Sequence, residues 1–394
     1  MTPASALPPL VEPGPELTAE EIARYSRHLI IPDVGMAGQR RLKNARVLVM
    51  GAGGLGSPTL LYLAAAGVGT LGIVDFDVVD ESNLQRQILH GVADVGRAKI
   101  ESARDAIAAI NPLVRVELHD VVLTNHNAVE LFRRYDLILD GTDNFATRYL
   151  VNDAAALAHK PYVWGSIFRF SGQVSVFWED APGGRGLNYR DLYPQAPPAG
   201  LVPSCAEGGV FGLLCGTIGS LMGAEAIKLL CGIGDPLLGR LLIYDALAMT
   251  HRTVRFARDP DRTPITALID YDAFCGVPAV DTDTAADTSS ITPLQLRAEL
   301  DGDDPPVLID VREPVEWEIA ALPGALLVPR GDIVDGRWSA QIPREGRVVL
   351  YCKTGIRSAQ VLAALRAAGL DRVVHLEGGI LAWAQQVDPE MPTY

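Results

Sequence analysis

The chain has 394 residues, of which 48% are hydrophobic and 21% charged, so it is long enough for two globular domains and too apolar for a disordered or fibrous protein. Its net charge of −14 argues against wholesale binding to nucleic acid or to an anionic membrane. Its 5 cysteines are scattered without a paired spacing, which is typical of reduced thiols in a cytosolic protein.

The first residues, 1–16, have neither the basic start nor the apolar stretch of a signal peptide, so we predict a disordered lead-in and a cytoplasmic protein. From Thr18, the N-cap of a capping box, the sequence predicts a first helix. The longest apolar stretch, 210–232, is interrupted by glycines and carries Glu225 and Lys228. We therefore do not interpret it as a membrane span.

Strand patterns and helical patterns then alternate along the chain. Strand patterns at 45–50 and 70–77 enclose a Gly-rich turn and a helical pattern, which predicts a β-α-β unit. Residues 162–180 have the alternating aromatic and polar pattern of antiparallel strands. The segment 276–290, rich in Asp, Thr and Ala, predicts a linker, and the alternation resumes over 291–394. The fold class is therefore α/β, with a mostly parallel sheet in the domain 17–275 and a second, smaller α/β domain.

The turn GAGGLG places Gly51, Gly53 and Gly56 between a strand and a helix. Small residues there let phosphates approach the backbone and the helix N-terminus. Asp75, at the end of the next strand, can accept hydrogen bonds from ribose hydroxyls. These features alone fit an NAD-dependent oxidoreductase equally well.

The cations that follow favour a triphosphate over a nicotinamide cofactor. Arg86 and Lys99 belong to loops that face the same crevice, and Arg27 lies in the N-terminal helix. Transfer at phosphorus is catalysed mainly by positioning and by cations that neutralise charge on oxygen. After the fourth strand, Asp143 offers a Mg²⁺ ligand and Asn144 a polar neighbour. The sequence therefore predicts a site for ATP and Mg²⁺.

Several stretches in order match one family: RYSRHLI, GAGGLGSP, VDFDVVDESNLQRQ, GRAK, TDNFATRYLVND and PSCAEGGVFG. Through them residues 17–258 resemble the MoeB/ThiF family of ATP-dependent activating enzymes, relatives of the ubiquitin-activating enzymes. The resemblance implies a Rossmann-like domain that adenylates the C-terminal glycine of a ubiquitin-like carrier protein and releases pyrophosphate. It assigns ATP and Mg²⁺ to Gly51, Gly53, Gly54, Asp75, Ser82, Asn83, Leu84, Gln85, Arg86, Lys99, Asp143 and Asn144.

The resemblance also implies a homodimer through this domain, with Arg27 reaching the ATP site across the interface. Each assigned residue has a structural alternative. A glycine in such a turn can serve helix packing, and Ser82 or Asn83 can cap a helix. Arg86 or Lys99 alone would most often be surface charge. Their joint occurrence on one set of loops favours the functional interpretation.

The chain departs from many relatives where these bind zinc through two CxxC pairs. The corresponding positions are 188–191, which carry no cysteine, and 272–275, which carry only Cys275. One cysteine cannot replace four thiolates, so we expect no zinc. Cys205 matches a cysteine that some relatives use in thioester or disulfide intermediates, although a buried small residue is the alternative. Cys215 and Cys231 fall on helical apolar patterns and are predicted to lie in the core.

The stretch YCKTGIRS places Cys352 between a strand and a helix. A thiolate is stabilised by nearby cations and by the N–H groups of a helix N-terminus. We therefore expect the loop formed by Lys353, Thr354, Gly355, Ile356 and Arg357 to stabilise an anion at or beyond the sulfur. Cysteine phosphatases have five residues between cysteine and arginine, whereas only four lie here. The smaller loop favours a sulfane sulfur over phosphate.

With LIDVREPVEWE, LPGALLVP and LEGGILAW around this loop, residues 292–390 resemble a rhodanese domain, whose cysteine carries a persulfide. The chain departs from that family at Ala320 and Ala321, where Gly-His is frequent. An inactive rhodanese module used as a binding platform is the alternative, but such modules typically lack the cysteine.

Together the two resemblances imply an adenylyltransferase joined to a sulfurtransferase. The Cys352 persulfide would attack the carrier adenylate, and Cys205 would help to reduce the product. The implied partners are a MoaD-, ThiS- or CysO-like carrier ending in Gly-Gly and a sulfur donor such as a cysteine desulfurase or thiosulfate. The pathway, for example molybdopterin or cysteine biosynthesis, is not identified. Two alternatives stay open: conjugation of a ubiquitin-like protein through a Cys205 thioester, and a scaffold that only docks carriers.

Overall fold

The computed structural model describes residues 7–197, 208–275, 289–337, 341–343 and 346–394. Its contacts divide the chain into two compact units, Met1–Ala279 and Val280–Tyr394, and each is described by itself. The predicted linker falls almost entirely outside the described residues, and so does Cys205. The predicted domain limits therefore stay a prediction.

The described strands of the first unit form one sheet in the order β3-β2-β1-β4-β5-β6-β7-β8. The strands are β1 (Arg46–Met50), β2 (Thr70–Val74), β3 (Arg115–His119), β4 (Leu137–Asp140), β5 (Tyr162–Phe168), β6 (Ser171–Phe177), β7 (Arg240–Asp245) and β8 (Thr250–Arg255). The helices are α1 (Ala19–Arg24), α2 (Ser26–Leu29), α3 (Gly35–Asn44), α4 (Gly56–Ala65), α5 (Lys99–Ile110), α6 (Ala128–Arg133), α7 (Phe145–Leu157), α9 (Gly212–Cys231) and α10 (Tyr271–Phe274).

The sheet is parallel from β3 through β5 and antiparallel from β5 through β8. This confirms the predicted mostly parallel sheet and the antiparallel strands predicted over 162–180. Strands β1, β2 and β4 are buried along most of their length, as expected for parallel strands covered on both faces. The strand order reverses between β1 and β4, which is where an open α/β sheet leaves a crevice for a ligand.

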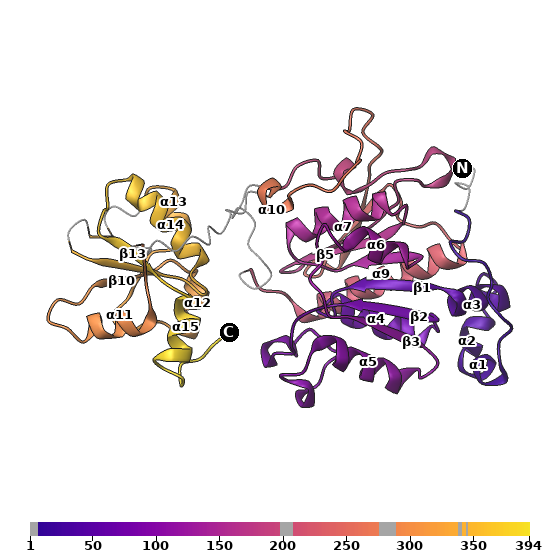
Figure 1. Ribbon diagram of the computed structural model, residues 1–394, viewed down its shortest axis with the longest axis horizontal. Coiled ribbons are helices and arrows are strands. Elements are labelled where there is room, and N and C mark those ends of the chain that lie inside the picture. Colours follow the sequence, from indigo (N-terminus) through magenta and orange to yellow (C-terminus); the bar gives the residue numbers. More distant parts are fainter. Residues whose placement is uncertain (1–6, 198–207, 276–288, 338–340, 344–345) are drawn as a thin grey trace. The chain divides into compact units, whose positions relative to one another are not determined.

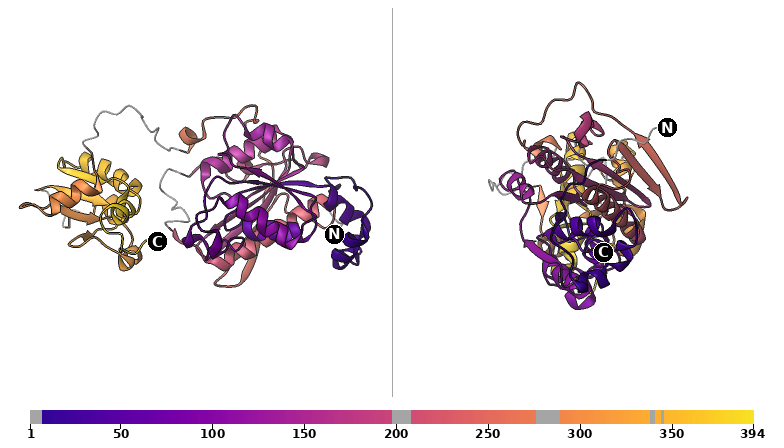
Figure 2. Two further views of the ribbon diagram at one scale, coloured as in Figure 1. Left: turned by 60° about the horizontal axis from the view of Figure 1, so that its bottom comes forward. Right: turned by 90° about the vertical axis from the view of Figure 1, so that its right-hand side faces the viewer.

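Helices cover both faces of this sheet. Figures 1 and 2 show α6 and α7 on one face and α4 and α5 on the other. Helix α9 packs against α4, α3, β5 and β6. By length and composition alone α9 could cross a membrane, but within this unit Leu214, Ile218 and Met222 lie in the core.

The N-terminal segment differs from the prediction of a disordered lead-in. Residues 7–16 are described, and Leu7 and Val11 are buried in the core of the first unit. The backbone N–H of Leu10 donates to the carbonyl of Leu229, at 3.1 Å. Two buried apolar side chains and hydrogen bonds of residues 10–14 with α9 and α3 hold this segment in place. The predicted capping box at Thr18 is confirmed, although the first helix is divided at Tyr25 into α1 and α2.

The second unit has a parallel sheet in the order β11-β10-β12-β13-β9. Its elements are β9 (Ser290–Ile291), α11 (Pro293–Leu300), β10 (Val307–Asp310), α12 (Pro314–Ile319), β11 (Leu326–Leu327), α13 (Arg330–Val334), β12 (Val348–Tyr351), α14 (Ile356–Ala367), β13 (Val373–Leu376) and α15 (Gly379–Gln386). Two apolar clusters fill this unit. One contains Leu362 and Leu365 of α14, and the other Leu296 of α11 and Trp383 of α15. This confirms the predicted second α/β domain.

Candidate functional site

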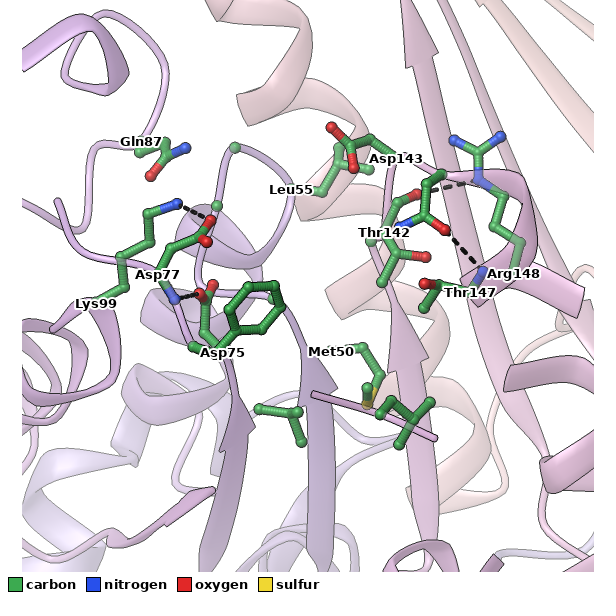
Figure 3. A pocket seen from close by; sticks show the side chains of 18 of the residues that line it. Met50, Leu55, Asp75, Asp77, Gln87, Lys99, Thr142, Asp143, Thr147 and Arg148 are labelled. Carbon is green, nitrogen blue, oxygen red and sulfur yellow. Dashed lines mark hydrogen bonds and ion pairs between the residues drawn. The ribbon is translucent and has the colours of Figure 1, made fainter. Parts of the chain in front are cut away.

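A pocket of about 270 Å³ opens in the first unit at the carboxyl ends of β1, β2 and β4. Figure 3 shows Asp75, Asp77 and Lys99 on one side of it and Thr142, Asp143 and Arg148 on the other. Many residues predicted from the sequence line this pocket: Gly51, Gly53, Gly54, Asp75, Arg86, Lys99, Asp143 and Asn144. The structure therefore brings the predicted Gly-rich turn, carboxylates and cations together at the switch point of the sheet.

The Gly-rich turn forms one wall of the pocket, and its glycines are required for different reasons. Gly51 has φ +89°, a conformation that favours glycine. A Cβ at Gly56 would lie 1.9 Å from the carbonyl oxygen of Gly51, and one at Gly54 would lie 2.7 Å from Sγ of Cys215. Cys215 is buried as predicted, but it also lines the pocket.

Asp75 is held by the backbone on both sides of its carboxylate. Its Oδ2 accepts a hydrogen bond from the Ala52 N–H at 2.8 Å, and its Oδ1 accepts from the Asp77 N–H at 2.9 Å. Because each oxygen has a second lone pair, the carboxylate can still accept from a ligand hydroxyl. The Lys99 ammonium, which is 8% exposed, pairs with Asp77 at 2.9 Å. The charge that the sequence assigned to a triphosphate is thus matched by a carboxylate in this structure.

The opposite wall begins at the end of β4. Asp140 is fully buried, and its Oδ1 accepts from both the N–H and the hydroxyl of Thr142. Burial raises the pKa of Asp140 to about 6 despite these hydrogen bonds. Asp143 and Asn144 both line the pocket, and the side chain of Asn144 also caps α7 by accepting from the Thr147 N–H.

Some predicted residues do not line this pocket. Ser82 and Asn83 form a 3-10 turn in which Asn83 completes a capping box with Asp80, so capping, the structural alternative, is realised here. Leu84 and Gln85 follow this turn outside the lining. Arg27 lies in α2 and lines a different pocket of the first unit, so one chain does not bring it to the site.

Sequence reasoning missed two buried polar residues that line the pocket. Gln87 is 5% exposed, and its Oε1 has no hydrogen-bond partner among the described residues. Arg148 donates to the carbonyl of Thr142 at 3.0 Å, and its guanidinium lies over the Trp164 ring. The signal for Gln87 was its place directly after Arg86. Arg148 left no local signal, since its role depends on a strand that comes later in the chain.

An ion-pair and aromatic network includes residues of 188–191 and 272–275, the two stretches at which we expected no zinc. Arg190 forms two hydrogen bonds with Asp153, which also accepts from the Tyr271 hydroxyl. The Arg190 guanidinium lies over the rings of Tyr149 and Phe274. Cys275 is buried, and burial raises its pKa. In the part of the chain that the structure describes, no group of three or more His, Cys, Asp or Glu side chains is arranged to hold a metal.

In the second unit, β12 ends at Tyr351 and delivers Cys352 to the predicted loop before α14. The Gly355 N–H donates to Sγ of Cys352 at 3.1 Å, and the Ser358 hydroxyl, which donates to the Gly355 carbonyl at 3.0 Å, lies 3.6 Å from the sulfur. Gly355 has φ +92°, which turns its N–H toward the sulfur. One backbone N–H of the predicted loop therefore reaches the sulfur, and the Ser358 hydroxyl at the start of α14 lies beside it.

Arg357 has a different position from the one we expected. Both of its terminal nitrogens donate to Glu316 of α12, at 2.7 Å each, and both side chains are buried. Burial alone would raise the pKa of Glu316, but the hydrogen bonds from Arg357, the Glu313 N–H and Tyr394 lower it to about 2. The Arg357 charge is therefore matched by a carboxylate, because the chain supplies one from a helix 41 residues earlier.

The loop is also fixed by backbone contacts with the start of α15. The N–H groups of Ile380 and Leu381 donate to the carbonyls of Cys352 and Lys353. Gly379 has φ +61°, and a Cβ there would lie 2.5 Å from each of these two carbonyl oxygens. The LEGGILAW stretch thus supports the cysteine loop directly.

Comparison with known proteins agrees with these two sites. The ThiF family model matches residues 25–264, and the rhodanese-like domain model matches residues 292–386. The chain therefore belongs to the ThiF family and carries a rhodanese-like domain.

Over almost its whole length the chain is similar to a protein named as both an adenylyltransferase and a sulfurtransferase. It is 66% identical over 391 residues to the probable adenylyltransferase/sulfurtransferase MoeZ of Mycobacterium tuberculosis, covering 99% of this chain and 100% of that protein. It is 54% identical to the sulfur carrier protein adenylyltransferase of Thermus thermophilus, covering 66% of this chain and 98% of that protein. The structure of E. coli MccB with ATP shares the fold of the first unit, with a TM-score of 0.52 and 22% identity over 61% of this chain and 72% of that one.

Proposed function

We propose that this protein adenylates the C-terminal glycine of a ubiquitin-like sulfur-carrier protein and then transfers sulfur to it from a persulfide on Cys352. The product is a carrier thiocarboxylate. The observation that carries the proposal is the presence in one chain of two sites, a Gly-walled pocket at a sheet switch point and a cysteine whose sulfur accepts a hydrogen bond from the Gly355 N–H. The names of the two relatives support both half-reactions.

The pocket fits ATP by the chemistry of its walls. The Gly51 to Gly54 turn and the start of α4 offer backbone N–H groups to phosphates. The apolar residues Val121, Val122 and Leu123 give the adenine ring a place beside Asp75, which suits a ribose hydroxyl. Arg86 supplies positive charge at the phosphates.

Asp143 is the residue that would hold Mg²⁺. Mg²⁺ is typically bound in such sites by one or two carboxylates together with substrate phosphates, so a single carboxylate in the lining is sufficient. When bound, the ion neutralises charge on the phosphate oxygens. Lys99, which pairs with Asp77, would have to exchange this carboxylate for a phosphate oxygen. Both side chains line the pocket.

The proposed reaction passes through an acyl-adenylate and an acyl disulfide. The carrier carboxylate attacks the α-phosphorus of ATP, forming an acyl-adenylate and releasing pyrophosphate. A persulfide on Cys352, loaded by an upstream donor, attacks the activated carbonyl and displaces AMP, which leaves the carrier joined to Cys352 through an acyl disulfide. A second thiol, for which Cys205 is the candidate, attacks Sγ of Cys352 and releases the thiocarboxylate. The resulting disulfide is then reduced by an external thiol.

The test is to incubate the protein with ATP, Mg²⁺, a carrier ending in Gly-Gly and thiosulfate, and to weigh the carrier. We expect one oxygen to be replaced by one sulfur. Cys352→Ala should keep carrier-dependent exchange of pyrophosphate into ATP but lose the thiocarboxylate, and Cys275→Ala serves as the matched control. Thiocarboxylate formation by Cys352→Ala in the absence of free sulfide would refute the role of Cys352. A stable carrier thioester at Cys205 that is indifferent to Cys352 would indicate conjugation instead.

The homodimer and the role of Arg27 belong to this proposal. Arg27 lines a pocket with Tyr62 and Ile227, and Tyr62 and the neighbouring Ile22 and Ile30 are exposed. An exposed apolar surface of this kind fits contact with a second copy of the chain. Mixing Arg27→Ala with Asp143→Ala should restore part of the pyrophosphate exchange, because one site of the mixed dimer is intact. No recovery in the mixture would count against a shared site.

A further inference from the structure

The segment that follows α15 returns to the cysteine loop and places Tyr394 against it. The Tyr394 hydroxyl donates to Oε1 of Glu316 at 2.8 Å and accepts from Nη1 of Arg312 at 2.7 Å. The ammonium of Lys353 lies 4.5 Å from the centre of the Tyr394 ring. Figure 1 marks this end of the chain near α12, the helix that carries Glu316. Tyr394 therefore contacts both the Arg357–Glu316 ion pair, through Glu316, and Lys353, the residue after Cys352.

Tyr394 is held firmly because both partners of its hydroxyl are fixed. Arg312 is fully buried, where it pairs with Asp310 and donates to the Ala320 carbonyl. Glu316 is fixed by its two hydrogen bonds with Arg357. Burial, and then the hydrogen bond to Glu316, raise the pKa of Tyr394, so the phenol stays protonated and remains a donor.

The ring contact acts on the charge of Lys353, the residue that directly follows Cys352 in the chain. The loop contains two cations, and the Arg357 charge is matched by Glu316. The Tyr394 ring face attracts the Lys353 ammonium through its quadrupole. Lys353 is bonded directly to Cys352, so an ammonium held in one place there can guide an anionic reagent to Sγ.

We propose that Tyr394 is a positioning residue for sulfur loading: its ring holds the Lys353 ammonium where it attracts an anionic sulfur donor to Cys352. This inference rests on the proposed function, since it concerns the loading of the same cysteine. With thiosulfate as the probe, the Cys352 thiolate attacks the outer sulfur and releases sulfite. Cyanide then removes that sulfur as thiocyanate and restores the thiolate.

The test compares Tyr394→Leu, which removes the ring, with Tyr394→Phe, which keeps it, in thiosulfate:cyanide sulfurtransfer by the full chain. We expect Tyr394→Leu to raise KM for thiosulfate about fivefold, the order expected from losing a cation–π contact, with kcat unchanged. Tyr394→Phe should restore the KM of the unsubstituted protein. In a Lys353→Ala background, Tyr394→Leu should have no further effect. An unchanged KM in Tyr394→Leu, or an equal loss of kcat in both variants, would overturn the inference.

A second measurement does not depend on turnover. Alkylation of Cys352 by iodoacetate and by neutral iodoacetamide is followed on the peptide that contains Cys352. Tyr394→Leu should lower the iodoacetate-to-iodoacetamide rate ratio severalfold, whereas Tyr394→Phe should not. If both reagents accelerate equally, Tyr394 merely covers the loop and the inference is wrong. If the unsubstituted protein turns over no thiosulfate while this ratio responds as expected, the proposed sulfur transfer is in doubt and the placement of Lys353 by Tyr394 is supported.

Discussion

Replacing Glu316 with glutamine should destabilise the second unit strongly, because the buried Arg357 guanidinium loses its counter-charge. The pKa of Glu316 falls from 4.5 to about 2, and this difference corresponds to about 3 kcal/mol of stability. Breaking a buried ion pair on one side typically costs about 3–5 kcal/mol, which agrees. We therefore expect the slowest-exchanging amides of α14 to exchange about 100-fold faster in Glu316→Gln than in the unsubstituted protein.

Hydrogen exchange read by mass spectrometry of α14 peptides measures this change in the full chain. Glu318→Gln is the matched control, because it removes the same charge from the same helix at an exposed position. Peptides from β1 should not respond. The folded-state pKa of Glu316 is depressed, so its contribution is present above about pH 4.5 and is lost as the pH falls toward 2. Protection in Glu316→Gln within about threefold of the unsubstituted protein, or an unaltered pH dependence, would refute this reasoning.

Three further predictions concern the first unit. Gly54→Ala should abolish pyrophosphate exchange, because its Cβ would lie 2.7 Å from Sγ of Cys215. The added substitution Cys215→Ala should restore part of the exchange. An equal loss of exchange in the single and the double variant would contradict the steric cause. Arg190→Met should lower the free energy of unfolding by about 3 kcal/mol, since Asp153 stays buried without its partner, whereas the exposed Arg133→Met should cost less than about 1 kcal/mol in the same urea titration. Washing with a chelator should leave the unfolding midpoint unchanged, and one zinc per chain in a metal assay would contradict the absence of a zinc site.

The parts of the site that depend on local backbone geometry were predictable from the sequence. The turn at Gly51 to Gly56 and the loop at Cys352 each follow a strand and precede a helix, and glycines at these points indicate the required conformations. Asp75 could be placed because it ends the strand next to β1. Such features leave their signal within a few neighbouring residues.

The features that were missed depend on partners far along the chain. Tyr394 contacts Glu316 over a separation of 78 residues, and Arg357 contacts it over 41. Arg148 depends on Trp164 of the next strand. No local spacing indicates these pairs, because residues so far apart in the chain come together only in the folded domain. The docking of residues 7–16 was missed because their prolines and polar residues hid two buried apolar side chains, Leu7 and Val11.

Backbone atoms at the start of α15 hold the cysteine loop in place. The N–H groups of Ile380 and Leu381 donate to the carbonyls of Cys352 and Lys353, and Gly379 lies close to both carbonyls. The shape of the loop thus does not depend on the side chains of Thr354 and Ile356, which are exposed. Those two positions can be varied by evolution, or in a library, to suit a new donor or acceptor surface without rebuilding the sulfur-carrying scaffold. Gly379 is the position at which such a library should not vary.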